Sequence, residues 1–269
     1  MPGFRRTTDY PLFDTHAHYN DHKFDEGGET EGRDSVLEDL FSQNIRHIVN
    51  AGTKPETNLE SIALAEKYPG MYAAVGIHPE DIDPEDDIET VMGELERQLS
   101  HPKVVALGEI GLDYHWDTVP KDTQKVWLRR QLALAEKTGM PVIIHDREAH
   151  GDSLRIVCDY PGLRGVFHCF SGSVEMAREL LRRGWYLGFD GPITYKNAVK
   201  ALDVIAACPT DRMLLETDSP YLSPVPNRGK RNDSRNLPYI AARIAEIKGM
   251  TTEEVAEVTL QNGKQLFGL

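Results

Sequence analysis

The sequence predicts an α/β fold, a single (β/α)8 barrel that spans residues 1–269. Eight short segments rich in β-branched and apolar residues alternate with longer segments of helical period, and no linker divides the chain. After the first strand, the sequence reads Asp14-Thr15-His16-Ala17-His18. An open nucleotide-binding sheet, the alternative arrangement of such units, would carry a glycine-rich phosphate turn there.

The expected strands are short apolar runs, as in buried parallel sheets. They are Leu12–Asp14, Arg46–Asn50, Tyr72–Gly76, Val104–Gly108, Pro141–His145, Gly165–His168, Tyr186–Phe189 and Met213–Glu216. Amphipathic spacing predicts the helices between and after them. These are Ser35–Gln43, Asn58–Lys67, Ile88–Leu99, Thr123–Lys137, Ser153–Asp159, Val174–Arg183, Asn197–Ala206, Pro238–Lys248 and Thr252–Leu266. Gly249 ends the penultimate helix, and Thr251 with Glu254 forms a capping box for the last one.

Composition narrows the function classes. With 30 basic and 43 acidic residues the net charge is -13, which disfavours passive binding to nucleic acid or anionic membranes, so a polyanionic substrate needs local positive charge. Cys158, Cys169 and Cys208 are widely spaced, which argues against a disulfide framework. No apolar run approaches the ~18 residues of a membrane span, and the first residues contain no apolar leader segment. We therefore expect a cytoplasmic protein without membrane association.

Histidines and carboxylates fall just beyond the expected strands, and in a barrel these strand ends meet on one face. His16 and His18 follow the first strand at a spacing that places two side chains on one side of extended backbone. Glu109 follows the fourth strand between apolar residues and glycines, where it needs a metal ion or, alternatively, a basic side chain as partner. Asp113 is expected on the following loop, as a capping residue or a partner of a ligand.

The later strands add further donors. His145 and His168 each end an apolar run, although a single histidine in such a place is commonly structural. Asp218 lies two residues beyond the eighth strand, where it suits a metal ligand and a proton acceptor, or alternatively a turn before Ser219-Pro220. Glu216 is a second possible active carboxylate. His78 follows the third strand and is expected to contact substrate.

Together these residues supply four imidazoles and two carboxylates, enough for two divalent ions with open positions for water and substrate. The predicted ligands are His16, His18, Glu109, His145, His168 and Asp218. His22, His47, His101, His115 and His150 are expected to be surface or structural residues. Histidine with carboxylate suits Zn, Mn, Fe or Mg, so the pattern leaves the metal open.

The chain resembles the TatD family of metal-dependent hydrolases. The resemblance rests on Asp14-Thr15-His16-Ala17-His18, Gly108-Glu109-Ile110-Gly111-Leu112-Asp113-Tyr114, His145, Phe167-His168-Cys169-Phe170-Ser171-Gly172 and Glu216-Thr217-Asp218-Ser219-Pro220-Tyr221-Leu222. It continues through 191–197 and 228–232 to Asn262 and 266–268, so it covers essentially the whole chain.

This resemblance implies an amidohydrolase-like barrel with two metal ions and a deoxyribonuclease activity, often of the 3′ to 5′ exonuclease type. Carried over by motif, His16 and His18 bind the first ion and Asp218 completes it. Glu109 bridges the two ions, and His145 and His168 bind the second. Two loops depart from the family pattern, Phe24–Arg33 and Asn232–Asn236, and both are expected to border the site and influence substrate preference.

The expected mechanism is attack of a metal-activated water on phosphorus, with Asp218 taking its proton and His78 as a nominee for assisting the leaving oxygen. Arg147, Arg228, Lys230 and Arg231 are expected to bind phosphate groups, and Tyr195, Phe170 and Tyr221 to stack a base. Two alternatives stay open. One is hydrolysis of a small-molecule amide, ester or lactone, or of a misacylated transfer RNA, and the other is a metal-binding protein without catalysis.

Overall fold

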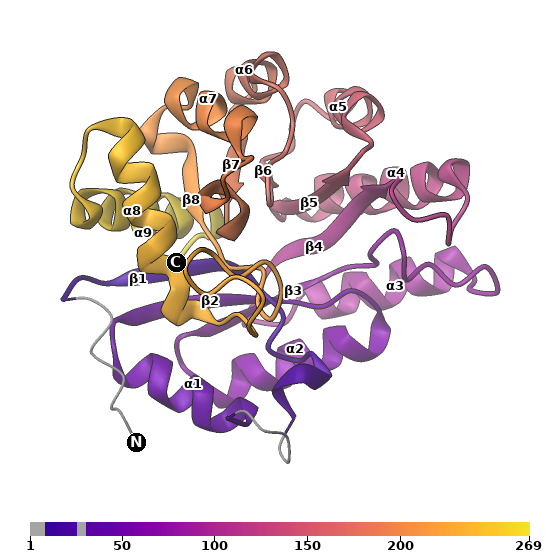
Figure 1. Cartoon of the computed structure of the whole chain (residues 1–269). Helices are drawn as coiled ribbons and strands as arrows, with labels where there is room; N and C mark the ends of the chain where they lie inside the picture. Colours follow the sequence, from indigo (N-terminus) through magenta and orange to yellow (C-terminus); the bar gives the residue numbers. More distant parts are fainter. Residues whose placement is uncertain (1–8, 26–30) are drawn as a thin grey trace.

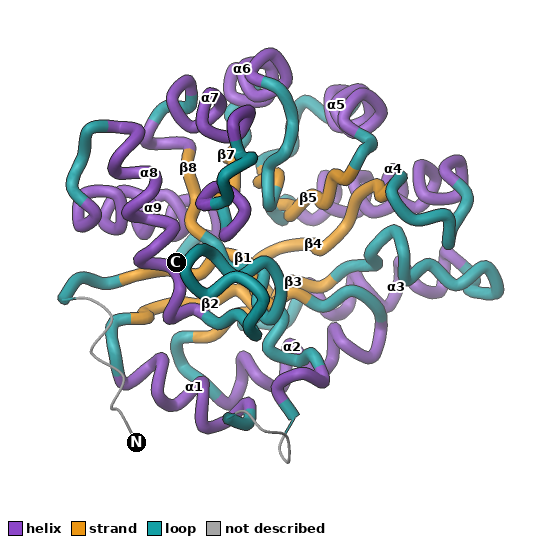
Figure 2. Tube along the Cα trace, in the orientation of Figure 1, coloured by secondary structure: helices purple, strands orange, loops and turns teal. Residues whose placement is uncertain are grey.

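A computed structural model describes residues 9–25 and 31–269. Within them, eight parallel strands form one sheet in the order β1 to β8, each paired with the next along the chain. A parallel bridge between Ala17 and Ser219 links β1 to the segment after β8, so the sheet nearly closes into a barrel with the helices outside it (Figures 1 and 2). This confirms the predicted (β/α)8 barrel.

The strands coincide with the expected segments but differ in length. They are β1 (Leu12–Ala17), β2 (Ile45–Ala51), β3 (Met71–Val75), β4 (Val104–Asp113), β5 (Val142–Arg147), β6 (Gly165–Phe167), β7 (Tyr186–Phe189) and β8 (Met213–Leu215). β1 and β4 run further than predicted, and β4 still pairs with β5 where Asp113 lies opposite Arg147. His16 and Glu109 therefore lie within strands, whose paired backbone fixes their direction.

Helices follow the strands around the barrel. They are α1 (Arg33–Ser42), α2 (Pro55–Lys67), α3 (Ile88–Leu99), α4 (Lys121–Thr138), α5 (His150–Cys158), α6 (Val174–Arg182), α7 (Val199–Ala207), α8 (Leu237–Lys248) and α9 (Thr252–Phe267). Short 3-10 turns occur at η1 (His22–Phe24), η2 (Gly191–Thr194), η3 (Thr210–Arg212) and η4 (Ser234–Asn236). α2 begins at Pro55, before the predicted start, because proline is favourable at the first helical position. The capping box of Thr251 and Glu254 and the end of α8 at Gly249 are confirmed.

The core has two layers that follow the alternation of strand side chains. The larger layer lies between the sheet and the helices, and the smaller one includes Phe13, Ile143 and Leu214, from alternate strand positions. α9 contributes Leu266 and Phe267 to the smaller layer, and the Phe267 ring lies 6.0 Å from that of Phe13. The barrel therefore has a packed interior, and its polar side chains gather at the carboxyl ends of the strands. Among the described residues, no helix has both the length and the apolarity that crossing a bilayer requires.

Candidate metal centre

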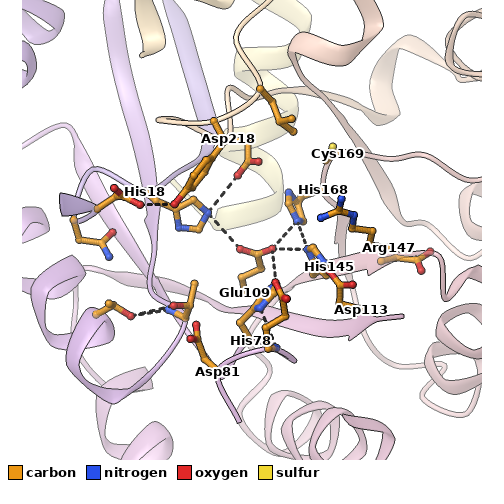
Figure 3. A pocket seen from close by; sticks show the side chains of 18 of the residues that line it. His18, His78, Asp81, Glu109, Asp113, His145, Arg147, His168, Cys169 and Asp218 are labelled. Atoms are coloured by element: carbon orange, nitrogen blue, oxygen red, sulfur yellow. Dashed lines mark hydrogen bonds and ion pairs between the residues drawn. The ribbon is translucent and has the colours of Figure 1, made fainter. Parts of the chain in front are cut away.

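Glu109 is the centre of the polar cluster at the carboxyl ends of the strands (Figure 3). Its side chain is almost completely buried, and its two oxygens face different histidines. Oε2 lies 3.3 Å from His16 Nε2 and 3.4 Å from His18 Nε2. Oε1 lies 2.8 Å from His145 Nδ1 and 2.7 Å from His168 Nε2. One carboxylate thus separates two pairs of imidazoles, as a bridging ligand does.

In the first pair, His16 lies in β1 and His18 directly follows this strand, and the loop after β8 completes the group. His16 Nε2 and His18 Nε2 are 3.1 Å apart. Asp218 Oδ1 lies 3.3 Å from His18 Nε2 and 3.7 Å from His16 Nε2. Donors from the first strand and from the loop after the eighth strand therefore meet at one point, although about 200 residues separate the two histidines from Asp218 in the sequence.

The second pair comes from β5 and from the residue after β6. His145 Nδ1 and His168 Nε2 are 3.2 Å apart, and both face the same oxygen of Glu109. His78, from the loop after β3, lies 3.6 Å from that oxygen through its Nε2 atom. His78, Glu109 and His145 therefore form a further group with the spacing of metal ligands. His78 was expected only to contact substrate, so it lies nearer to the predicted ligands than that expectation implies.

Hydrogen bonds on the outer side of the cluster fix two of the rings. His18 Nδ1 donates to the Ala51 carbonyl at 2.9 Å, so its Nε2 lone pair faces the centre. His145 Nε2 donates to Asp113 Oδ2 at 3.0 Å, so its Nδ1 lone pair faces Glu109. Lone pairs that face lone pairs or a carboxylate are favourable only with a proton or a cation between them. The donor set and its orientation therefore fit divalent metal ions.

The backbone around these ligands is closely packed and locally strained. Asp218 and Cys169, which follows His168, have φ values of 55° and 43°, a left-handed conformation that non-glycine residues seldom adopt. At Gly111 in β4, an added Cβ would lie 1.9 Å from the His145 carbonyl oxygen. Only glycine allows the two strands to approach so closely, and this approach brings Asp113 within reach of the His145 ring.

Charge and burial set the protonation of the cluster. Burial would raise the pKa of Asp218, but its hydrogen bond with His18 and the nearby imidazoles hold that pKa below its ordinary value. Burial would lower the pKa of His145, but hydrogen bonds to Asp113 and Glu109 raise it to about 10. Burial, together with His145, lowers the pKa of His78 to about 3. His78 is therefore neutral near pH 7, and because its Nδ1 accepts from the Glu80 backbone N–H at 3.2 Å, its Nε2–H is the hydrogen-bond donor on the side of the cleft.

A cavity of about 780 Å³ opens over the cluster, and we call it the metal cleft. His18, His78, Glu109, His145, His168 and Asp218 line it, together with Asp113, Arg147, Cys169 and Tyr221. Further carboxylates, Asp21, Glu80, Asp81 and Asp146, line its sides, and His22, expected to be an ordinary surface residue, does so as well. Sequence reasoning missed these residues because they lie on loops and in strands whose direction the pattern does not give.

The predicted substrate-binding residues separate into two groups. Arg147 lines the cleft, and its guanidinium stacks at 5.6 Å on the half-exposed Trp116 ring. Tyr195, Arg228 and Lys230 are not among the described residues that line the cleft. Tyr195 lines a neighbouring cavity, where the Arg228 guanidinium stacks on its ring at 4.3 Å.

The two loops that depart from the family pattern do not line the metal cleft within the described residues. Residues 26–30 of the first loop lie outside those residues. In the second, Asn232–Asn236, Ser234 is buried and donates to Asp14 Oδ2 at 2.6 Å. Asn232 donates to the carbonyls of Thr217 and Tyr221 at 2.8 and 2.7 Å, so this second loop lies beside the Asp218 segment and supports it without lining the cleft.

Asp113 is also placed differently from expectation. It is the last residue of β4, not a loop residue, and it is buried. Besides its hydrogen bond to His145, its Oδ1 atom accepts from the backbone N–H of His115 at 2.8 Å. The expected role of orienting a ligand is therefore present in its geometry, whereas the N–H groups that it accepts from belong to the turn after β4 and not to a helix, since α4 begins at Lys121.

The fold and the donor set are those of metal-dependent hydrolases built on a (β/α)8 barrel. Residues 13–268 match the family model described as TatD related DNase, and the chain belongs to this family. A Bacillus subtilis relative, named as the uncharacterized metal-dependent hydrolase YabD, is 43% identical over 258 residues, which cover 95% of this chain and 98% of the relative. The Escherichia coli relative YcfH, described in the same words, is 34% identical over 236 residues, 87% of this chain and 88% of the relative. The crystal structure of the Escherichia coli TatD homologue YjjV has a TM-score of 0.87 and 31% identity, covering 96% of this chain and 98% of that one.

Proposed function

We propose that this metal-dependent hydrolase is a two-metal deoxyribonuclease that removes nucleotides from the 3′ end of DNA. The observation that carries the proposal is the position of Glu109, with each oxygen facing its own pair of imidazoles. This arrangement suits a pair of ions that act together on a phosphodiester. The family description and the size of the cleft, which suits a terminal nucleotide better than a duplex, support DNA as the substrate.

In this proposal, His16, His18 and Asp218 hold one divalent ion, His145 and His168 hold the other, and Glu109 is shared. Bound ions supply polarisation of a phosphoryl oxygen and a lowered pKa for water. Zn, Mn, Mg and Fe are the ions to consider, since imidazole and carboxylate ligands accept each of them.

The chain's own groups supply the proton transfers and the positioning. Asp218 is ionised near pH 7, because its pKa lies below the ordinary value, and it lines the cleft, so it accepts a proton from the attacking water. The neutral ring of His78 orients the substrate by donating a hydrogen bond from Nε2, since Nδ1 accepts from the Glu80 N–H, and the leaving oxygen takes its proton from solvent. Arg147 at the rim neutralises a neighbouring phosphate, which an acidic protein needs near its site.

The test is reconstitution followed by digestion. Elemental analysis gives the metal content of the purified chain, which is then stripped and reloaded with Zn, Mn, Mg or Fe in turn. With DNA labelled at its 5′ end, we expect products that shorten one nucleotide at a time, on single-stranded and duplex substrates. Asp218→Asn should lower turnover by roughly 10²- to 10⁴-fold with an unchanged circular dichroism spectrum.

Two results would reject the proposal. If no metal restores DNA hydrolysis, while a lactone, an ester or a misacylated transfer RNA is hydrolysed, the chemistry belongs to another bond. If the metal-loaded Asp218→Asn protein turns over at a near-normal rate, Asp218 is not the proton acceptor. Asp117→Asn, a change at an exposed position beyond the end of β4, serves as the matched control.

A further inference from the structure

A second cavity, of about 420 Å³, adjoins the metal cleft, and we call it the Asp190 cavity. It lies between the loop after β6, the end of β7 with η2, and the beginning of α7. Cys169, Ser171 and Pro192 line both cavities, so a single molecule can reach from one into the other. Its volume lies in the usual range for small-ligand sites.

The walls of the Asp190 cavity are largely aromatic and apolar. Phe170, Phe189 and Ile193 are buried and line it. The Tyr195 ring is held from two sides, because its hydroxyl donates to the Ser223 carbonyl at 2.9 Å and the Arg228 guanidinium stacks on it at 4.3 Å. A fixed aromatic ring beside an apolar wall is a stacking surface for a flat ring.

A carboxyl group lies in this apolar cavity. Asp190 is 2% exposed and lines the cavity, and no described residue donates a hydrogen bond to its Oδ2 atom. Glu216, behind Gly188, has the same deficit at Oε2. A Cβ at position 188 would lie 2.3 Å from that Oε2 atom, so glycine makes the room for the second carboxyl group. A buried acceptor without a donor is costly, and a ligand N–H removes that cost.

We propose that the Asp190 cavity is a nucleobase-binding subsite, in which the base lies along the Tyr195 ring and a base amino group donates to Asp190. The inference rests on the proposed function, since the base would belong to the nucleotide whose phosphate enters the metal cleft. A metal ion fits less well. The described residues place no group of three metal donors here.

The geometry makes a specific demand on the base. The Asp190 Oδ2 atom has no hydrogen-bond partner among the described residues, and cytosine N4, adenine N6 and guanine N2 carry amino groups that donate. Uracil and thymine present a carbonyl oxygen at the position where cytosine carries its amino group. The subsite should therefore favour cytosine over uracil, two rings of nearly the same size and shape.

The test compares 2′-deoxycytidine with 2′-deoxyuridine by isothermal titration calorimetry on the metal-loaded full chain. We expect deoxycytidine to bind about tenfold more tightly, the value of one well-formed buried hydrogen bond. Equal affinities, or no binding of either nucleoside, would overturn the inference. Neither nucleoside has a phosphodiester bond, so the result does not depend on hydrolysis. A protein that prefers deoxycytidine but leaves DNA intact would contradict the proposed nuclease alone.

Two variants locate the effect. Asp190→Ala should reduce the preference for deoxycytidine to less than twofold, because it removes both carboxyl oxygens. Asp203→Ala, the same change at an exposed position of α7, should keep the tenfold preference. Ala201→Trp places an indole in the cavity from α7 and should abolish binding of both nucleosides. Retained deoxycytidine binding in a folded Ala201→Trp protein, checked by circular dichroism, would place the nucleoside elsewhere and overturn the inference.

Discussion

Two buried polar clusters lie close together where β1 meets the segment after β8, and their hydrogen bonding differs. In the metal cleft, nitrogen lone pairs face one another and a carboxylate, and His16 Nδ1 and His168 Nδ1 have no partner among the described residues. In the neighbouring Asp14 cluster, which consists of Asp14, Tyr19, Thr217 and Ser234, every donor meets an acceptor. Asp14 accepts from the Thr217 N–H and hydroxyl and from the Ser234 hydroxyl, at 3.0, 2.6 and 2.6 Å.

The difference separates a structural network from a ligand site. The Tyr19 hydroxyl accepts from the Ser234 N–H at 2.9 Å and donates to the Ser234 hydroxyl at 2.7 Å, so the Asp14 cluster is complete without a ligand. The metal cleft is complete only when cations lie between its donors. Burial and polarity are the same in both clusters, so the balance of donors and acceptors is the feature that identifies the functional one.

The largest expected effect is the loss of the shared carboxylate in the cleft. Glu109→Gln removes its charge and turns an N–H₂ toward imidazole lone pairs, so we expect hydrolysis to fall by roughly 10³-fold or more. Saturating metal, at about a hundred times its dissociation constant, should stabilise the wild-type chain by about 2.7 kcal/mol and the variant by much less. Thermal unfolding with and without metal measures this increment. A variant that keeps the full increment would contradict the bridging role, and Glu136→Gln on the exposed side of α4 is the control.

The complementary change, in the Asp14 cluster, should lower stability and leave metal binding intact. Asp14→Ala leaves the Thr217 and Ser234 donors buried without an acceptor, and we expect the free energy of unfolding to fall by about 3 kcal/mol. Urea unfolding measures the fall, and the stabilising increment from metal should persist. Asp122→Ala, which removes an exposed carboxylate, should change stability by less than about 0.5 kcal/mol. Loss of the metal increment in Asp14→Ala would show that the two clusters are not independent.

A third change tests whether the hydrogen bond between Asp113 and His145 contributes to metal affinity. Asp113→Ala removes the acceptor that orients the His145 ring, so metal affinity should fall by roughly 10- to 100-fold. Competition with a chelating dye measures the affinity, and Asp117→Ala is the exposed control beyond the end of β4. Unchanged affinity would mean that packing alone orients His145.

The sequence could predict the barrel and the convergence of its donors because both follow from local patterns. Apolar runs mark strands, parallel strands share a carboxyl edge, and His145 directly follows such a run. It could not predict how far a strand continues, since the pairing of β4 as far as Asp113 depends on β5. Asp14 belongs to the motif that follows the first strand, but its role depends on Ser234, 220 residues away.

The substrate contacts show a second kind of limit. Arg228 is expected to bind phosphate and Tyr195 to stack a base on the same face as the metal ligands, but the Arg228 guanidinium stacks on the Tyr195 ring, and Tyr195 lines the Asp190 cavity. Spacing along the chain places a residue on the rim, whereas the direction of its side chain depends on contacts with other loops. Donors within or directly after a strand are therefore easier to place from the sequence than donors on loops, even though both kinds of side chain are equally polar.

The smallest expected effect concerns the rim of the metal cleft, where a charge acts on substrate without touching the metals. Arg147→Gln removes the guanidinium that stacks on Trp116, so binding of single-stranded DNA should weaken several-fold and equally for all sequences. The slope of log affinity against log salt should fall by about one, because one phosphate contact is lost. Tryptophan fluorescence measures binding directly, because Trp116 is half-exposed whereas Trp127 and Trp185 are buried in the core. Arg155→Gln, on the exposed side of α5, should leave the slope unchanged, and an unchanged slope in Arg147→Gln as well would place the DNA backbone on another side of the cleft.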